Sequence, residues 1–135
     1  VIIPEPFYAN YNGFAVAAGV NVVPITSYIE NGFALPPIED FEKVLTPKTK
    51  AIVVCNPNNP TGTKLEAAQI RSFCEEASKK AVVVVDEVYH DFIDDASMIP
   101  LALSNPNVVV VRSFSKIYGL AGLRKQLSTT TNTGN

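Results

Sequence analysis

The sequence predicts an α/β protein of three layers, in which helices cover both faces of a mostly parallel sheet. Short runs rich in β-branched residues recur at positions 20–25, 51–55, 81–85 and 108–111. Each run is too short for a helix and too uniformly apolar for a strand with one face in water, which is typical of buried parallel strands. Segments with helical spacing separate the runs, and this alternation favours right-handed crossovers between strands.

Helices are expected in three segments, at residues 11–18, 38–44 and 65–78. The third is the clearest, because its apolar side chains trace one face of a helix: Leu65, Ala68, Ile70, Phe73, Cys74 and Ala77. Turn-forming residues mark the loops, namely NG at 31–32, PP at 36–37, the run at 56–62 and NP at 105–106. No linker or internal repeat divides the chain, so we expect a single domain.

The composition argues against several classes of partner. At 135 residues, with 47% hydrophobic and 18% charged residues, the chain is typical of one globular domain. A net charge of -2 without a basic cluster argues against binding to nucleic acid. No apolar run approaches the ~20 residues that cross a bilayer, and the first residues lack a signal-peptide pattern, so we expect no membrane partner and a cytoplasmic location.

The cysteines and the histidine do not form a recognisable metal or disulfide pattern. Cys55 and Cys74 lack the spacing of a disulfide framework or a zinc site, so both are expected to be reduced and structural, and no metal is predicted. His90, the only histidine, is expected in a structural or surface role. The start without Met and the polar end, residues 125–135, lead us to expect a fragment.

Polar motifs follow the apolar runs at 51–55 and 81–85. In open α/β sheets, ligands bind beyond the carboxyl ends of the strands, which is where these motifs lie. NPNNPTG at residues 56–62 offers amide donors, although it could simply cap the next helix. DEVY at residues 86–89 places Asp86 at the end of a strand, where a buried carboxylate needs a cationic partner. No nearby Lys or Arg is obvious, so a ligand cation is a candidate, and a turn cap is the simpler alternative.

The next loop, RSFSKIYG at residues 112–119, contains a lysine near the mouth of the sheet. Desolvation there would lower the pKa of Lys116 toward that of a nucleophilic amine. Ser113, Ser115 and Arg124 could bind a phosphate, and the alternative is a solvated loop with a snorkelling lysine. Together the loops supply an amine, a carboxylate, a phenol, an amide and an anion site, which is the set that pyridoxal phosphate needs.

Two other chemistries fit the sequence less well. SFSK at residues 113–116 also matches the Ser-x-x-Lys pattern of β-lactamase-like enzymes, but the SDN and KTG motifs that accompany it are absent from the sequence. No GxGxxG follows any expected strand, which disfavours a nicotinamide-dependent Rossmann enzyme.

The ordered motifs NPTG, DEVY and SFSK, followed by Arg124, resemble the large domain of class I/II (fold-type I) pyridoxal-phosphate-dependent aminotransferases, such as aspartate and other amino-acid aminotransferases. The resemblance covers residues 1–124, which we expect to be a partial large domain, and leaves residues 125–135 as an unassigned tail. It implies transamination between an amino acid and a 2-oxo acid, in a parent protein that forms a homodimer.

The resemblance also implies a role for each motif residue. Lys116 would hold the cofactor as a Schiff base and carry a proton between substrate and cofactor. Asp86 would pair with the pyridinium nitrogen and so keep the ring an electron sink. Asn59 and Tyr89 would hold the phenolate oxygen.

The remaining cofactor contacts follow from the same resemblance. Ser113 and Arg124 would bind the phosphate, with the planar guanidinium reaching two oxygens. Tyr8 falls where the family places an aromatic ring over the cofactor, although it could equally be a core residue. A cis peptide bond is implied between Asn59 and Pro60.

Departures from the family pattern leave two alternatives open. The Gly-rich phosphate loop and the substrate-binding arginine of the relatives are absent, so the chain could be a non-catalytic fragment. The same Lys, Asp and Tyr also serve other fold-type I enzymes, such as C-S lyases or cyclopropane-forming synthases.

Overall fold

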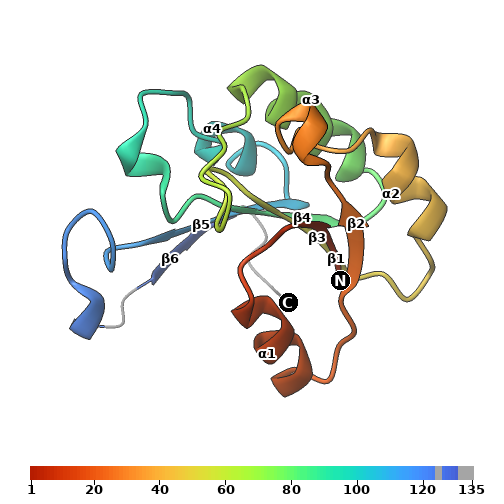
Figure 1. Ribbon diagram of the computed structural model, residues 1–135, viewed down its shortest axis with the longest axis horizontal. Helices are drawn as coiled ribbons and strands as arrows, with labels where there is room; N and C mark the ends of the chain where they lie inside the picture. Colours follow the sequence, from red (N-terminus) through yellow and green to blue (C-terminus); the bar gives the residue numbers. More distant parts are fainter. Residues whose placement is uncertain (124–125, 131–135) are drawn as a thin grey trace.

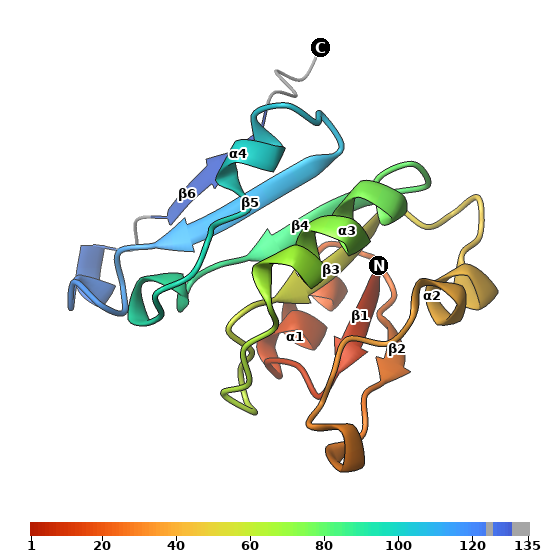
Figure 2. The ribbon, with the colours of Figure 1, turned by 90° about the horizontal axis from the view of Figure 1, so that it is seen from above.

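The computed structural model describes residues 1–123 and 126–130. Among these residues, six strands form one sheet in the order β2-β1-β3-β4-β5-β6, which Figure 2 shows from above. The strands are Ile2–Glu5 (β1), Val23–Thr26 (β2), Ala51–Cys55 (β3), Val82–Asp86 (β4), Val108–Ser113 (β5) and Gln126–Thr129 (β6). All pairings are parallel except that of β5 with β6, so the expected mostly parallel sheet is confirmed.

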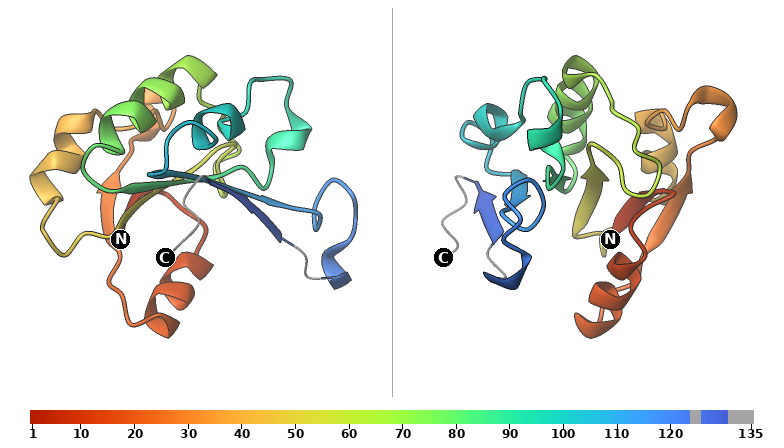
Figure 3. Two further views of the ribbon diagram at one scale, coloured as in Figure 1. Left: turned by 180° about the vertical axis from the view of Figure 1, so that it is seen from behind. Right: turned by 60° about the vertical axis from the view of Figure 1, so that its left-hand side comes forward.

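Helices lie on both faces of the sheet, as the three-layer prediction requires. The α-helices are Asn10–Ala17 (α1), Ile38–Val44 (α2), Ala67–Ala77 (α3) and Ile99–Ala102 (α4), and short 3-10 turns occur at Ile29–Asn31, His90–Phe92 and Ala121–Leu123. Helices α2, α3 and α4 cover one face, and α1 lies on the other (Figures 1 and 3).

The main core lies between the sheet and the helices α2, α3 and α4. Alternate residues of the central strands point toward these helices, because successive side chains of a strand face opposite sides. Phe41 of α2 is 0% exposed, and its ring centroid lies 4.7 Å from that of Phe73 in α3. The central strands contribute the buried side chains Ile52, Val54, Val83, Val85, Val108 and Val110. This closed layer fixes the strands whose ends carry the site.

Several element boundaries differ from the sequence-based expectation. The expected strand at residues 20–25 starts only at Val23, because its pairing with β1 begins at Ile2 opposite Val23. Strand β5 continues to Ser113, since its last residues pair with β6. Strand β1 and helix α4 were not predicted, because each has only four residues and contains a proline.

Strand β6 lies inside the polar segment that we left unassigned. Its residues pair antiparallel with β5, Leu127 opposite Arg112 and Thr129 opposite Val110. Polar residues form a strand here because one neighbouring strand supplies the ladder of backbone hydrogen bonds, which does not depend on apolar side chains.

The carboxyl ends of the five parallel strands meet at one edge of the sheet. The chain leaves β1 toward α1 on one face, and it leaves β3 toward α3 on the other (Figure 1). Such a reversal between neighbouring strands opens a crevice where α/β proteins bind ligands. The loops after β1, β3, β4 and β5 are therefore brought together at this carboxyl edge.

Candidate functional site

The loops after β3 and β4 meet through a side-chain hydrogen bond. Asn59 donates from Nδ2 to the hydroxyl oxygen of Tyr89 at 3.1 Å. Both residues are half-buried. The two groups that were expected to share one ligand oxygen are therefore adjacent in the structure.

The other asparagines of the loop after β3 hold its shape. Asn56 accepts a hydrogen bond from the backbone N–H of Leu65 at 2.8 Å, and Asn58 donates from Nδ2 to the carbonyl of Pro6 at 3.2 Å. The second bond ties this loop to the loop after β1. The Asn59–Pro60 bond is cis, as the resemblance implied. Asn56 and Asn58 thus serve the fold, which leaves Asn59 as the amide that contacts Tyr89.

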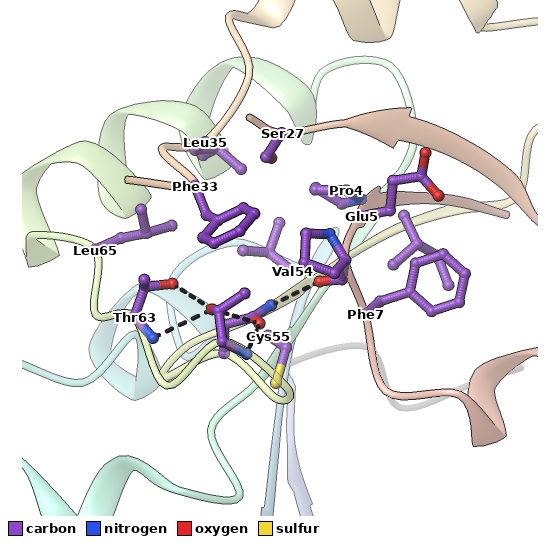
Figure 4. A pocket seen from close by; sticks show the side chains of 14 residues that line it. Pro4, Glu5, Phe7, Ser27, Phe33, Leu35, Val54, Cys55, Thr63 and Leu65 are labelled. Atoms are coloured by element: carbon purple, nitrogen blue, oxygen red, sulfur yellow. Dashed lines mark hydrogen bonds between the residues drawn. The ribbon is translucent and has the colours of Figure 1, made fainter. Parts of the chain in front are cut away.

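A small cavity lies beside this loop but outside the predicted site. Figure 4 shows its lining, in which Phe33 and Leu35 face the ends of β1 and β3. The lining is mainly apolar and includes neither Asp86 nor Lys116. We therefore assign this cavity to packing between loops.

The Asp86 carboxylate ends β4 and accepts two hydrogen bonds from neutral donors. Oδ1 accepts from the backbone N–H of Val88 at 3.0 Å, and Oδ2 accepts from the Tyr11 hydroxyl at 2.5 Å. None of the ion pairs among the described residues involves Asp86. The two oxygens of Asp86 therefore have lone pairs left for a cationic ligand group at the sheet edge.

The surroundings of Asp86 are poorly solvated. Burial raises the pKa of the Tyr11 phenol, and the charge of Asp86 raises it further. Burial also raises the pKa of the Cys55 thiol to about 12, with Asp86 as the next cause. Cys55 lies opposite Asp86 in the sheet register. Both neighbours consequently stay protonated and neutral near pH 7.

Ser113 and Lys116 occupy the turn that follows β5. Ser113 is 6% exposed, and its Oγ accepts a hydrogen bond from the backbone N–H of Ser115 at 3.0 Å. Lys116 is exposed, with Nζ lying 5.4 Å from the centroid of the Tyr89 ring. The expected desolvation of this lysine is therefore wrong for the described chain. The loop brings the amine to the site without enclosing it.

Tyr8 lies near the site, whereas the position of Arg124 is not described. Tyr8 is 41% exposed, and its ring makes an edge-to-face contact with Tyr11 at 6.4 Å between centroids. It therefore lies next to the residue that reaches Asp86. Arg124 lies outside the described residues. His90 is buried rather than at the surface, and its Nδ1 has no hydrogen-bond partner among the described residues.

Sequence reasoning missed a buried ion pair next to the site. Glu87 is 2% exposed and accepts hydrogen bonds from Arg112 Nε at 3.0 Å and Nη2 at 2.9 Å. These residues are the chain neighbours of Asp86 and Ser113, so the ion pair joins the ends of β4 and β5. The carboxylate also accepts from the backbone N–H of Met98. The only signal in the sequence was the acidic pair at 86–87, in which Asp86 was assigned to the ligand and Glu87 had no assigned partner.

Two classes of feature are not found among the described residues. No group of three or more His, Cys, Asp or Glu side chains in this part of the chain could hold a metal ion. No helix in the described ranges has the length and apolar character to cross a membrane.

Comparisons with known proteins agree with this geometry. The family model for aminotransferase class I and II matches residues 1–125, and the chain belongs to this family. Histidinol-phosphate aminotransferase 1 of Bacillus cereus is 36% identical over 130 residues, covering 92% of this chain and 33% of the relative. An aromatic amino acid aminotransferase of Rhodococcus erythropolis is 51% identical over 81 residues, covering 59% of this chain and 23% of the relative.

Solved structures show the same fold. An aromatic aminotransferase of Pyrococcus horikoshii matches with a TM-score of 0.83 and 29% identity, over 97% of this chain and 36% of its own. Aspartate aminotransferase of Thermotoga maritima matches with a TM-score of 0.86 and 25% identity, over 97% of this chain and 36% of its own. The chain thus spans about a third, or less, of the length of these curated and structural relatives.

Members of the family use pyridoxal 5'-phosphate, and the residues present fit this cofactor. The fit rests on donor chemistry: Asp86 has no cationic partner among the described residues, and an amide, a phenol and an amine lie together in the loops after β3, β4 and β5. A protonated ring nitrogen is the cation that such a carboxylate would bind.

Proposed function

We propose that the chain is the cofactor-binding part of a pyridoxal-phosphate-dependent aminotransferase that moves an amino group between an amino acid and a 2-oxo acid. One observation supports this most strongly. Tyr89 receives a hydrogen bond from Asn59, and its ring lies 5.4 Å from the Lys116 amine, so three chain segments converge on one phenol. In the proposal residues 1–124 are the partial large domain and residues 125–135 remain a tail of unassigned function.

The roles of the central residues follow from their chemistry. When bound, pyridoxal phosphate supplies an electron sink that lowers the energy of removing a proton from the substrate. Lys116 would hold the cofactor through its aldehyde as a Schiff base, and its amine, once the substrate's amino group has displaced it, would accept and return that proton as general base and acid. Asp86 holds the proton on the ring nitrogen through its charge.

The remaining residues orient the ring. Asn59 and Tyr89 donate to the phenolate oxygen from adjacent loops. Ser113 and Arg124 bind the phosphate, and the burial of Ser113 at the end of β5 suits an oriented donor. Tyr8 covers one face of the ring from the loop after β1.

Assembly, location and substrate class are part of the same proposal. The parent protein is a cytoplasmic homodimer, and the free thiols of Cys55 and Cys74 are consistent with a reducing compartment. The names of the relatives point to two kinds of amino-group donor, aromatic amino acids and histidinol phosphate.

Covalent labelling tests the proposal. The chain is incubated with pyridoxal phosphate and reduced with borohydride, and the labelled peptide is identified by mass. We expect one label per chain on Lys116, none in Lys116→Ala, and full labelling in Lys48→Ala, which removes another exposed lysine.

The pattern of labels separates the alternatives. Scattered or absent labels in the unsubstituted chain would contradict cofactor binding and favour a non-catalytic fragment. A label on Lys116 without any amino-group transfer, in a chain completed to full length, would favour another fold-type I enzyme, such as a C-S lyase or a cyclopropane-forming synthase.

A further inference from the structure

Tyr11 connects the helix α1 to the carboxylate at the end of β4. Its hydroxyl donates to Oδ2 of Asp86 at 2.5 Å, across 75 positions of the sequence. One strand separates the two segments in the sheet, because α1 follows β1, Asp86 ends β4, and β3 lies between β1 and β4. None of the motifs singled out in the sequence includes Tyr11.

Neighbouring aromatic rings hold the Tyr11 ring in place. Phe7, Tyr8 and Phe14 make edge-to-face contacts with it, at centroid distances of 6.5, 6.4 and 6.4 Å. Edge-to-face pairs have a preferred geometry, so three of them restrict the direction of the hydroxyl. The phenol is therefore aimed at Asp86 by packing as well as by its hydrogen bond.

The Tyr11 phenol remains a donor at the pH where enzymes work. Burial is the first cause that raises its pKa, and the nearby Asp86 charge is the second. Because the phenol stays protonated, it cannot become an anion that would repel the carboxylate. Its hydrogen bond to Oδ2 and that of Val88 N–H to Oδ1 fix both oxygens of Asp86.

We propose that Tyr11 is a positioning residue, which orients the Asp86 carboxylate toward the ring nitrogen of pyridoxal phosphate. This inference rests on the proposed function. Each carboxylate oxygen has two lone pairs, so both existing bonds leave room for a third donor from the ring. Without the phenol, Oδ2 loses its fixed donor and the carboxylate is free to rotate away from the ring nitrogen.

Cofactor binding tests this role with a matched pair of ligands. Dissociation constants are measured for pyridoxal phosphate and for its 1-deaza analogue, in which CH replaces the ring nitrogen. Tyr11→Phe removes only the hydroxyl, and Tyr28→Phe makes the same change at an exposed tyrosine. We expect Tyr11→Phe to weaken binding of pyridoxal phosphate about 10-fold, the size of one hydrogen bond to a charged group.

The analogue separates positioning from a general structural role. The 1-deaza analogue should bind the unsubstituted chain and Tyr11→Phe equally well, and Tyr28→Phe should change neither ligand. Equal weakening of both ligands by Tyr11→Phe would show that the hydroxyl supports the fold, and would overturn the inference. Unchanged binding of pyridoxal phosphate to Tyr11→Phe would overturn it as well.

A measurement without cofactor separates this inference from the proposed function. Proton NMR of the unloaded chain should show a downfield hydroxyl proton from one of the five tyrosines, absent in Tyr11→Phe and shifted upfield in Asp86→Asn. Its absence from the unsubstituted chain would overturn the hydrogen bond itself. If the proton is present but the chain binds no pyridoxal phosphate, the proposed function fails, and with it the role of Tyr11 toward the ring.

Discussion

Two regions of the sheet differ in how far their side chains are buried. One is the face under α2, α3 and α4, and the other is the carboxyl edge. On the covered face, Phe41 is fully buried and packs on Phe73. At the edge, by contrast, Lys116 is exposed and Tyr8 is 41% exposed. The first region is closed by residues of this chain alone, whereas the second is open above the groups that would carry chemistry.

This difference shows which parts of the proposed site the described residues set by themselves. The strands and helices that set the positions of Asp86, Tyr89 and Ser113 are complete, because their core is local to residues 1–113. Enclosure of the amine is not supplied by the described residues. In the proposed function, the described residues orient the cofactor ring but do not by themselves exclude water from the amine.

The largest expected effect tests the closed face. Phe41→Ala should lower the free energy of unfolding by about 3 to 5 kcal/mol, because it leaves a cavity against Phe73. Phe14→Ala makes the same change on α1, where the ring is 61% exposed, and should change stability by at most about 0.5 kcal/mol. Urea denaturation followed by circular dichroism measures both. Equal losses would show that the two faces are equally closed.

The alkylation rates of the two cysteines compare the core with the carboxyl edge. Burial raises the pKa of Cys74, in the core, and of Cys55, at the edge, each to about 12 from an ordinary 9.0. Near pH 8 this lowers the thiolate fraction about 1,000-fold, so alkylation by iodoacetamide should be slow in the folded chain and fast in urea. We expect Cys55 to react before Cys74, since the edge opens locally. Faster reaction of Cys74 would contradict the comparison.

The same pKa shifts set the direction of an alkaline effect on stability. Above pH 9 the unfolded thiols lose protons that the folded chain retains, so the unfolded state is favoured as pH rises toward 12. The stabilising contribution is fully present well below pH 9.0, the ordinary thiol pKa. Denaturation curves at pH 8 and pH 10.5 should show this loss in the unsubstituted chain, and a smaller loss in Cys74→Ala.

A smaller effect is expected at the ion pair that joins β4 to β5. Arg112→Met leaves the buried Glu87 carboxylate without its cation and should lower the free energy of unfolding by about 2 kcal/mol. This value is below that of a fully buried pair because the Arg112 side chain is 23% exposed. Lys80→Met breaks the exposed Lys80–Glu42 pair and should cost less than about 1 kcal/mol. A greater loss from Lys80→Met would contradict this ranking.

Much of the fold could be predicted from local patterns. The apolar run of β3 and the helix α2 have the bounds that the sequence indicated, because a buried strand and an amphipathic helix both leave a periodic signal. Strand β1 and helix α4 have four residues each, too few for such a signal. Strand β6 is polar and depends on the edge of β5, so its formation is decided by tertiary pairing.

The contacts of the site also include some that the sequence could predict and some that it could not. The contact between Asn59 and Tyr89 could be expected, because both follow neighbouring parallel strands and have one expected partner. The contact of Tyr11 with Asp86 depends on where α1 lies across the sheet, which no local pattern records. The exposure of Lys116 could not be predicted either, since it depends on which segments cover the loop.

The most direct test of the account is a map of where pyridoxal phosphate contacts this chain. Amide chemical shifts of the labelled 135-residue chain are followed by NMR while the cofactor is added. The account predicts changes clustered in residues 56–62, 86–89 and 113–116, with the amides of α2 and α3 unchanged. Changes that concentrate on α2 and α3, or no saturable change at the carboxyl edge, would contradict it.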